Sequence, residues 1–158
     1  MTGFTHFDAE GKAVMVDISD KETTARSASA KALVLMQPHT KTLIQQGGVK
    51  KGDVLAVARL AGIMAAKRTA ELIPLCHPLM LTAVTIDFAL EDAVPGVEVT
   101  ATCRLDGRTG VEMEALTAAA IAALTIYDMC KAIDRRIRIT DLRLVHKSGG
   151  KSGDFNGA

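Results

Sequence analysis

Two kinds of hydrophobic spacing follow one another along this chain, and their order limits the possible folds more than any other feature. Within residues 26–36, small and apolar residues occupy every second position from Ala28 to Met36, which is the period of a half-buried strand. After Asp53, a candidate N-cap, apolar residues recur at helical spacing. They predict an amphipathic helix that ends before Pro74.

The second half of the chain continues this succession. Residues 79–90 alternate again, and across a turn at Pro95-Gly96 residues 97–105 complete a predicted hairpin. A long helix is predicted over residues 114–133, because this alanine-rich stretch is nearly free of glycine and proline. Residues 137–145 then predict a last strand.

Three weaker signals complete the secondary structure. Residues 14–18 are typical of a short strand, and Pro38 opens a short predicted helix that ends near residue 46, before a glycine pair. The alternation of the last strand changes phase near Asp141, which indicates an irregularity there.

From residue 26 onward the long elements run strand, helix, strand, strand, helix, strand. This is the split β-α-β pattern of ferredoxin-like α+β domains, in which two long helices cover one face of an antiparallel sheet. A length of 158 residues suits one such domain. We expect a single domain over residues 1–158, with a flexible N-terminus at about residues 1–12 and a flexible glycine-rich tail at about residues 147–158.

Composition excludes several classes of protein. The 19 basic and 18 acidic residues nearly balance, so no broad basic surface for nucleic acid is expected. Three cysteines without a C-x-x-C pair suit a reducing cytoplasm better than a disulfide framework or a structural zinc site. Residues 1–10 lack the apolar core of a signal peptide, and the longest apolar stretch, residues 115–126, is shorter than a membrane span. We therefore expect a soluble, cytoplasmic protein.

A short segment between two prolines is the first candidate site. Leu75, Cys76 and His77 lie between Pro74 and Pro78, and proline restricts both itself and the preceding residue to non-helical shapes. The segment would then present backbone groups and an imidazole from a stiff loop. The same residues are equally compatible with a helix end followed by a strand start, with His77 only filling space.

Lysines near predicted loops are candidate phosphate ligands. Lys51 precedes the N-terminus of the first long helix, where the helix dipole favours an anion, and Lys67 lies further along that helix. Lys147 and Lys151 flank the glycine-rich tail. The tail is not a Walker motif, because Val145 stands where its first glycine is needed and no helix is predicted to follow. Solvated surface is the simpler interpretation for a single lysine such as Lys67.

Two acidic positions on the alanine-rich helix are candidates for recognition. Glu112 and Glu114 flank Met113 at the start of the helix, where carboxylates ordinarily complement the helix dipole. Two carboxylates two positions apart also suit an edge that accepts hydrogen bonds from a base bearing amino and ring N–H groups.

Asp128 and Lys131, three residues apart near the end of the same helix, form a candidate acid/base pair. Their neighbours are apolar, so we expect partial burial, which would shift their pKa values toward acid/base use. An ordinary surface ion pair is the alternative. On a continuous helix Glu114 and Asp128 stand about 21 Å apart, so a small substrate that meets both requires a site shared between subunits of a symmetric oligomer.

Taken together, nine segments resemble the cyclic pyranopterin monophosphate synthase (MoaC) family of molybdenum cofactor biosynthesis. The resemblance extends from about residue 5 to residue 154. The segments are residues 15–19 (MVDIS), 24–26 (TAR), 51–55 (KGDVL), 61–63 (AGI), 65–69 (AAKRT), 72–79 (LIPLCHPL), 110–117 (GVEMEALT), 127–132 (YDMCKA) and 147–153 (KSGGKSG).

The resemblance implies a lyase that converts 3′,8-cyclo-7,8-dihydro-GTP to cyclic pyranopterin monophosphate and releases pyrophosphate. It implies a homohexamer, a trimer of dimers, with shared active sites. It also implies an upstream radical S-adenosylmethionine enzyme that makes the substrate. It assigns no certain cofactor and no protein-bound metal, and leaves open a divalent cation such as Mg²⁺ accompanying the phosphates. Nucleic acid and membrane partners are not expected.

Residue roles follow from the same resemblance. Asp128 is the implied catalytic acid/base, with Lys51, Lys131 and Lys147 around the reacting centre. The implied substrate-binding residues are Leu75, Cys76, His77, Glu112, Met113, Glu114, Arg26 and Lys67. The alternative function, from another class, is a non-catalytic ferredoxin-like module that binds a nucleotide or phosphate ligand to regulate its own assembly.

Overall fold

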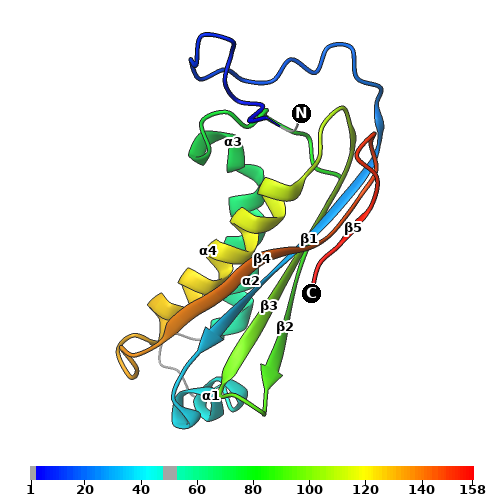
Figure 1. Cartoon of the computed structure of the whole chain (residues 1–158). Helices are drawn as coiled ribbons and strands as arrows, with labels where there is room; N and C mark the ends of the chain where they lie inside the picture. The colour runs from blue at the N-terminus through cyan, green and yellow to red at the C-terminus, as the bar shows by residue number, and fades with distance from the viewer. Residues whose placement is uncertain (1–2, 48–52) are drawn as a thin grey trace.

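A five-stranded antiparallel sheet with helices on one face makes up the part of the chain that the computed structural model describes, residues 3–47 and 53–158 (Figure 1). The elements run in the order β1 (Thr24–Leu35), α1 (Pro38–Gln45), α2 (Val54–Lys67), α3 (Thr69–Leu72), β2 (Ala83–Glu91), β3 (Gly96–Gly107), α4 (Glu112–Cys130), β4 (Arg138–Ser148) and β5 (Phe155–Asn156).

The sheet has the strand order β2-β3-β1-β4-β5. Helix α2 connects β1 to β2 and leaves room for β3 between them, while α4 connects β3 to β4 with β1 between them. The α+β class and the ferredoxin-like arrangement predicted from the order of long elements are therefore confirmed. The hairpin of β2 and β3 is confirmed as well.

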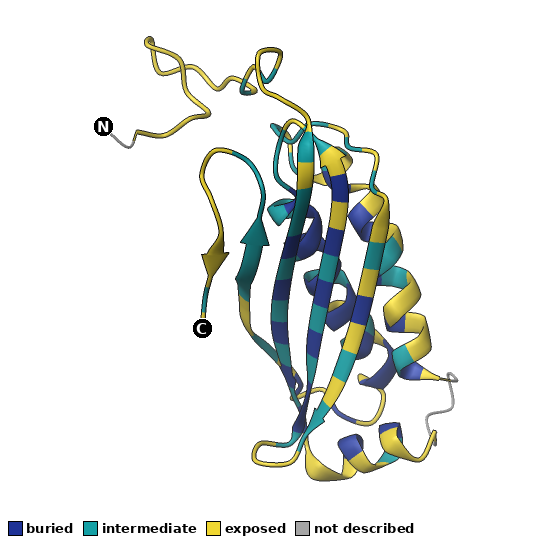
Figure 2. Cartoon of the chain, turned by 90° about the vertical axis from the view of Figure 1, so that its right-hand side faces the viewer, coloured by how far each residue is buried: buried dark blue, intermediate teal, exposed yellow. Residues whose placement is uncertain are grey.

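Alternating burial on the strands produces the core. Ala28, Ala30, Ala32 and Val34 of β1 are fully buried against the helices, and the residues between them are only half-buried (Figure 2). The side chains are small, so the helices lie close to the sheet and to each other. A Cβ atom added to Gly62 of α2 would lie 3.0 Å from the carbonyl oxygen of Ala118 in α4. Small residues thus decide the spacing of the layers.

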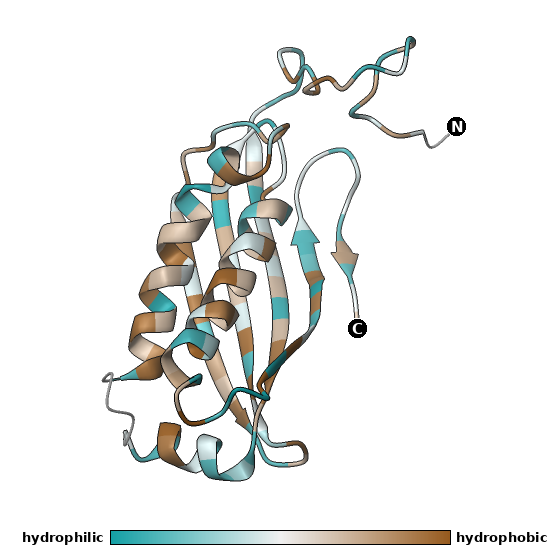
Figure 3. Ribbon diagram, turned by 90° about the vertical axis from the view of Figure 1, so that its left-hand side faces the viewer, coloured by the Kyte–Doolittle hydropathy of each residue, from teal (hydrophilic) through white to brown (hydrophobic). Residues whose placement is uncertain are grey.

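Helix α4 is 19 residues long, which is longer than the apolar stretch identified in the sequence, and its mean hydropathy is 1.3. By length and composition alone, such a helix could span a membrane. The prediction that this region is too short is therefore wrong. The apolar character of α4 is explained by packing instead, since it lies on the sheet beside α2 (Figure 3), and its alanines 115, 118, 119, 122 and 123 are fully buried. It is the core helix of the fold.

Two predicted elements differ in the structure. Residues 14–18 are not a strand, because no neighbouring strand pairs with them, and the isolated bridge in that region joins Phe7 to Ala13. The first long helix ends at Lys67, and the short α3 follows it. The Thr69 hydroxyl donates to the carbonyl oxygens of Ala65 and Ala66, and such a side-chain bond competes with the helical backbone pattern.

Part of the segment predicted as a tail is strand. β4 continues to Ser148, and β5 returns beside it through the pairs His146–Asn156 and Lys147–Phe155. Gly149 in the intervening turn has φ +93°, and a Cβ atom there would lie 2.1 Å from the carbonyl oxygen of Ala25. The turn therefore depends on glycine. Its mobility stays a prediction.

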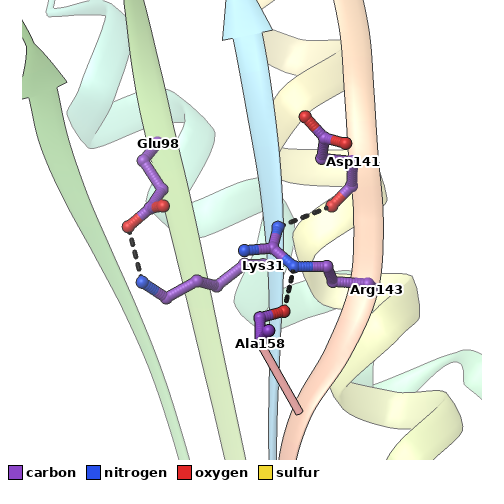
Figure 4. A network of polar contacts seen from close by, with 5 residues as sticks. All are labelled: Lys31, Glu98, Asp141, Arg143 and Ala158. Carbon is purple, nitrogen blue, oxygen red and sulfur yellow. Dashed lines mark hydrogen bonds and ion pairs between the residues drawn. The ribbon is translucent and has the colours of Figure 1, made fainter. Parts of the chain in front are cut away.

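The face of the sheet away from the helices carries a network of polar contacts (Figure 4). Lys31 of β1 and Glu98 of β3 form an ion pair of 2.7 Å, while Arg143 of β4 donates to the carbonyl oxygens of Asp141 and Ala158. Asp141 has φ +54°, which confirms the predicted irregularity in this strand.

Candidate active site

A cavity of about 440 Å³ forms where the start of α4, the loop after α3, the start of β1 and the end of β4 meet. These segments are far apart in the sequence, and the topology brings them to one end of the sheet. Eight of the predicted site residues line the cavity, namely Arg26, Leu75, Cys76, His77, Glu112, Met113, Glu114 and Lys147.

The loop between the two prolines presents its residues as predicted. It is neither helix nor strand, and the backbone N–H of Cys76 donates to the carbonyl oxygen of Ile73 in a turn. Leu75, Cys76 and His77 are half-buried and face the cavity. Burial, together with the negative charge of Glu114, raises the pKa of the Cys76 thiol, so this thiol stays protonated at neutral pH.

The two glutamates at the start of α4 have pKa values shifted in opposite directions. Burial acts to raise the pKa of Glu112, but the hydrogen bond and charge of Lys147, a backbone hydrogen bond and the charge of Arg26 together outweigh burial, and the net pKa is lowered. The two side chains are 2.7 Å apart, from Lys147 Nζ to Glu112 Oε1. Glu114 is only 4% exposed, and burial, with a smaller contribution from the charge of Glu112, raises its pKa to about 7. The cavity thus holds one ionised carboxylate and one that exchanges a proton near neutral pH.

Glu114 makes the stability of the fold dependent on pH. Because the folded-state pKa of about 7 lies above the ordinary value of 4.5, protonated Glu114 stabilises the fold fully below about pH 4.5. This contribution is lost as the pH rises through about 7, and it amounts to about 3 kcal/mol. Glu114→Gln is expected to flatten the decrease in unfolding free energy between pH 5 and 8, measured by urea denaturation. An unchanged pH dependence in the variant would contradict the shift.

Asp128 and Lys131 lie near the other end of α4, away from the cavity. Lys131 Nζ and Asp128 Oδ1 are 2.6 Å apart, and the side chains are 52% and 58% exposed. The hydrogen bond and the charge of Asp128 raise the pKa of Lys131. The expectation of partial burial is wrong for one chain, because the apolar neighbours Ile126, Met129 and Cys130 lie on the buried face of α4. Residues that are adjacent in the sequence point to different sides of a helix, so apolar neighbours do not imply that Asp128 is buried.

The other predicted lysines are placed separately. Lys67 is exposed at the end of α2 and does not line the main cavity, but it lines a smaller hollow of about 110 Å³ together with Glu114. Lys51 lies outside the described residues. Within residues 3–47 and 53–158, no group of three or more His, Cys, Asp or Glu side chains is arranged to hold a metal ion.

Sequence reasoning missed several residues that line the cavity. His6, Val16, Ile18 and Lys21 come from the segment before β1. That segment has no regular structure, so hydrophobic periodicity could not place it. The alternation of residues 14–18, which predicted a strand, coincides with the half-burial of Val16 and Ile18 in an otherwise exposed stretch. It indicated which side chains are partly covered, but not that they face the cavity.

Comparisons with known proteins agree with this geometry. The model of the MoaC family matches residues 15–150. A protein of Dinoroseobacter shibae named cyclic pyranopterin monophosphate synthase is 60% identical over 155 residues, which cover 98% of each chain. A protein of the same name from a Methylobacterium species is 57% identical over 155 residues, covering 98% of this chain and 97% of the relative.

Proposed function

Because this chain belongs to the MoaC family, we propose that it catalyses the reaction for which its relatives are named. It is a lyase that converts 3′,8-cyclo-7,8-dihydro-GTP to cyclic pyranopterin monophosphate and releases pyrophosphate, an early step of molybdenum cofactor biosynthesis. The observation that carries the proposal is the convergence of Glu112, Glu114, His77, Arg26 and Lys147 on one cavity.

The cavity supplies groups that suit a cyclised guanosine nucleotide. The carboxylates of Glu112 and Glu114 accept hydrogen bonds from the amino and ring N–H groups of the base, beside Met113. Leu75, Cys76 and His77 provide another part of the cavity wall, and Arg26 and Lys147 supply positive charge. Lys67, through the hollow that it shares with Glu114, lies at the border of this site.

Asp128 serves as the catalytic acid/base in this proposal, with Lys51, Lys131 and Lys147 around the reacting centre. Opening and reclosing a ring requires proton transfer, and departure of pyrophosphate builds negative charge that cations stabilise. Asp128 does not line the cavity of its own chain, so it serves the cavity of a neighbouring subunit.

A homohexamer built as a trimer of dimers, with sites shared between subunits, accommodates this arrangement. Its support in the structure is the outward face of the helix layer, where Val57, Leu60, Met64 and Leu124 are at least 42% exposed. A contiguous exposed apolar surface is typical of an interface. In this proposal the protein works in the cytoplasm and receives its substrate from a radical S-adenosylmethionine enzyme, and a divalent cation such as Mg²⁺ is the group that could accompany the substrate phosphates.

Incubation with the cyclised nucleotide tests the function. We expect pyrophosphate and the pyranopterin product to appear in equal amounts, detected by a coupled phosphate assay and by fluorescence of the oxidised pterin. GTP is the matched control, and no pyrophosphate should be released from it. Binding of the cyclised nucleotide without pyrophosphate release would instead support the alternative, a regulatory module that only binds nucleotides.

A further inference from the structure

A buried carboxylate outside the candidate active site lies just after α4. Asp134 is 2% exposed and lines no part of the cavity described above. Its Oδ2 atom accepts a hydrogen bond from the backbone N–H of Gln37 at 2.8 Å and another from the Thr40 hydroxyl at 3.0 Å. Its Oδ1 atom accepts from the backbone N–H of Arg136 at 3.0 Å. Both oxygens of this enclosed side chain are therefore paired.

The Asp134 carboxylate is ionised at neutral pH. Burial acts to raise the pKa of Asp134, but the hydrogen bonds from Gln37, Arg136 and Thr40 and the charge of Arg136 outweigh burial, and the net pKa is lowered. Hydrogen bonds to a charged acceptor are stronger than those between neutral groups. A buried charge that loses its partners is strongly destabilising, so the segments that donate to Asp134 resist separation from it.

These hydrogen bonds join two elements that are remote in the chain. Gln37 is the N-cap of α1, and Asp134 accepts from its backbone N–H as the third helical residue does in a capping box. The backbone N–H of Asp134 donates to the carbonyl oxygen of Cys130, the last residue of α4, at 3.0 Å. Asp134 thus fastens the end of α4 to the beginning of α1, and Figure 1 shows both at the same end of the sheet.

The candidate acid/base pair lies at this fastened end of α4. Lys131 is the C-cap of the helix, three residues before Asp134. Helix ends fray, because the last carbonyl groups lack partners within the helix. The Asp128–Lys131 pair is more than half exposed, and exposed ion pairs contribute too little to prevent fraying. The buried hydrogen bonds of Asp134 supply the stabilisation that the pair itself does not.

We propose that Asp134 is a positioning residue for the Asp128–Lys131 pair. By fastening the turn after α4 to α1, it keeps the last turn of the helix wound, and so keeps Lys131 on Asp128 in the orientation in which the pair meets the substrate. Asp134 itself does not touch the substrate. The inference rests on the proposed function for the chemical role of the pair, whereas the fixed geometry of Lys131 rests on the contacts of Asp134.

Asp134→Asn is the first test. The amide keeps the shape of the side chain and the backbone N–H, but it loses the negative charge and one of the two acceptor oxygens. We expect kcat to fall about 10- to 100-fold, the order of effect of a displaced catalytic group. KM should be nearly unchanged, because Asp134 lines no part of the cavity. Turnover is measured per folded subunit, below the unfolding transition of the variant. A lower melting temperature with wild-type kcat would mean a merely structural carboxylate and would overturn the proposal.

Asp92→Asn is the matched control. Asp92 also contacts α1, through an ion pair of 2.7 Å with Lys41, but it lies in the turn between β2 and β3 and is 95% exposed. This variant should keep the wild-type kcat. An equal decrease in Asp92→Asn and Asp134→Asn would show that the effect comes from loosening α1 in general, and it would contradict a specific role at the end of α4.

Variants of Thr40 keep the proposal testable if Asp134→Asn does not fold. Thr40→Val removes one donor and leaves the carboxylate its two backbone donors, so a smaller decrease in kcat is expected. Thr40→Ser restores the hydroxyl and should return kcat to near the wild-type value. A wild-type kcat in Thr40→Val, or an equal decrease in the Val and Ser variants, would count against the proposal.

Acetylation of Lys131 provides a measurement that does not depend on activity. The hydrogen bond and the charge of Asp128 raise the pKa of Lys131, so the paired amine stays protonated and reacts slowly. Loss of the pairing in Asp134→Asn should raise the rate of acetylation by acetic anhydride several-fold, followed by mass spectrometry. Lys31, paired with Glu98 at 2.7 Å, is the internal reference and should not change.

The failure of the positioning role and the failure of the proposed function have different signatures. If Asp134→Asn raises the acetylation of Lys131 but the wild type releases no pyrophosphate from the cyclised nucleotide, the positioning role stands and the function fails. If the wild type turns over the nucleotide, and Asp134→Asn keeps both its kcat and the slow acetylation of Lys131, the function stands and the positioning role is wrong.

Discussion

Asp128→Ala is expected to lower kcat by about 10²- to 10⁴-fold, the usual effect of losing a general acid or base. Lys131→Ala is expected to act in the same range, because the two side chains form one ion pair of 2.6 Å. Both are more than half exposed in the single chain, so neither replacement removes core packing, and the fold should be retained. The prediction is tested by measuring steady-state turnover of the cyclised nucleotide, and size-exclusion chromatography of each variant checks that the fold is retained.

The ion pair of Lys31 and Glu98 gives a matched control. Its Nζ–Oε1 distance is 2.7 Å, and it lies on the face of the sheet away from the helices, outside the cavity residues. Glu98→Ala should keep nearly normal turnover. If Asp128→Ala does so as well, Asp128 is not the acid/base.

Mixing two inactive variants is expected to restore activity if each site is built by two chains. In a mixture of Glu114→Ala and Asp128→Ala subunits, random association gives about a quarter of the sites both wild-type residues. The reason is geometric, since the two residues stand about 21 Å apart on one helix and only one of them lines the cavity. Recovery of turnover is followed after subunit exchange, with exchange shown by mass spectrometry of differently tagged chains.

The control mixture pairs Glu114→Ala with His77→Ala. Both residues line the cavity of the same chain, so every hybrid site carries one of the two changes and no recovery is expected. His77 also serves as the partner for Asp128→Ala if the buried Glu114 proves necessary for folding. Absence of recovery in the test mixture, with exchange demonstrated, would mean that each site lies within one chain.

Much of the fold could be predicted from the sequence because its causes are local. Alternation in β1, helical spacing in α2 and the absence of glycine and proline in the middle of α4 reflect the period of each backbone conformation. Only a few sheet topologies are compatible with this order of strands and helices. Residues 75–77 were predicted correctly as a non-helical loop, since proline restricts its own backbone conformation and that of the preceding residue.

The family could also be inferred from the sequence, because short motifs spread over nearly the whole chain are specific in combination. The comparisons confirm it. Through the motifs the sequence also identified eight residues that prove to line one cavity. It could not show that they meet, because residues 26, 75–77, 112–114 and 147 come together only when the strands pair.

Other features were decided by tertiary structure alone. Periodicity could not assign Val16, Ile18 and Lys21 to the cavity, because these residues lie in a segment before β1 that forms neither helix nor strand. The burial of Asp128 was misjudged because burial depends on which helix face the sheet covers, whereas the sequence shows only neighbours along the chain. The pKa of about 7 for Glu114 depends on the same enclosure. The sequence thus determined the elements and the chemical groups, while exposure, pKa and proximity arose only from packing, since each depends on distances between residues that are remote in the chain.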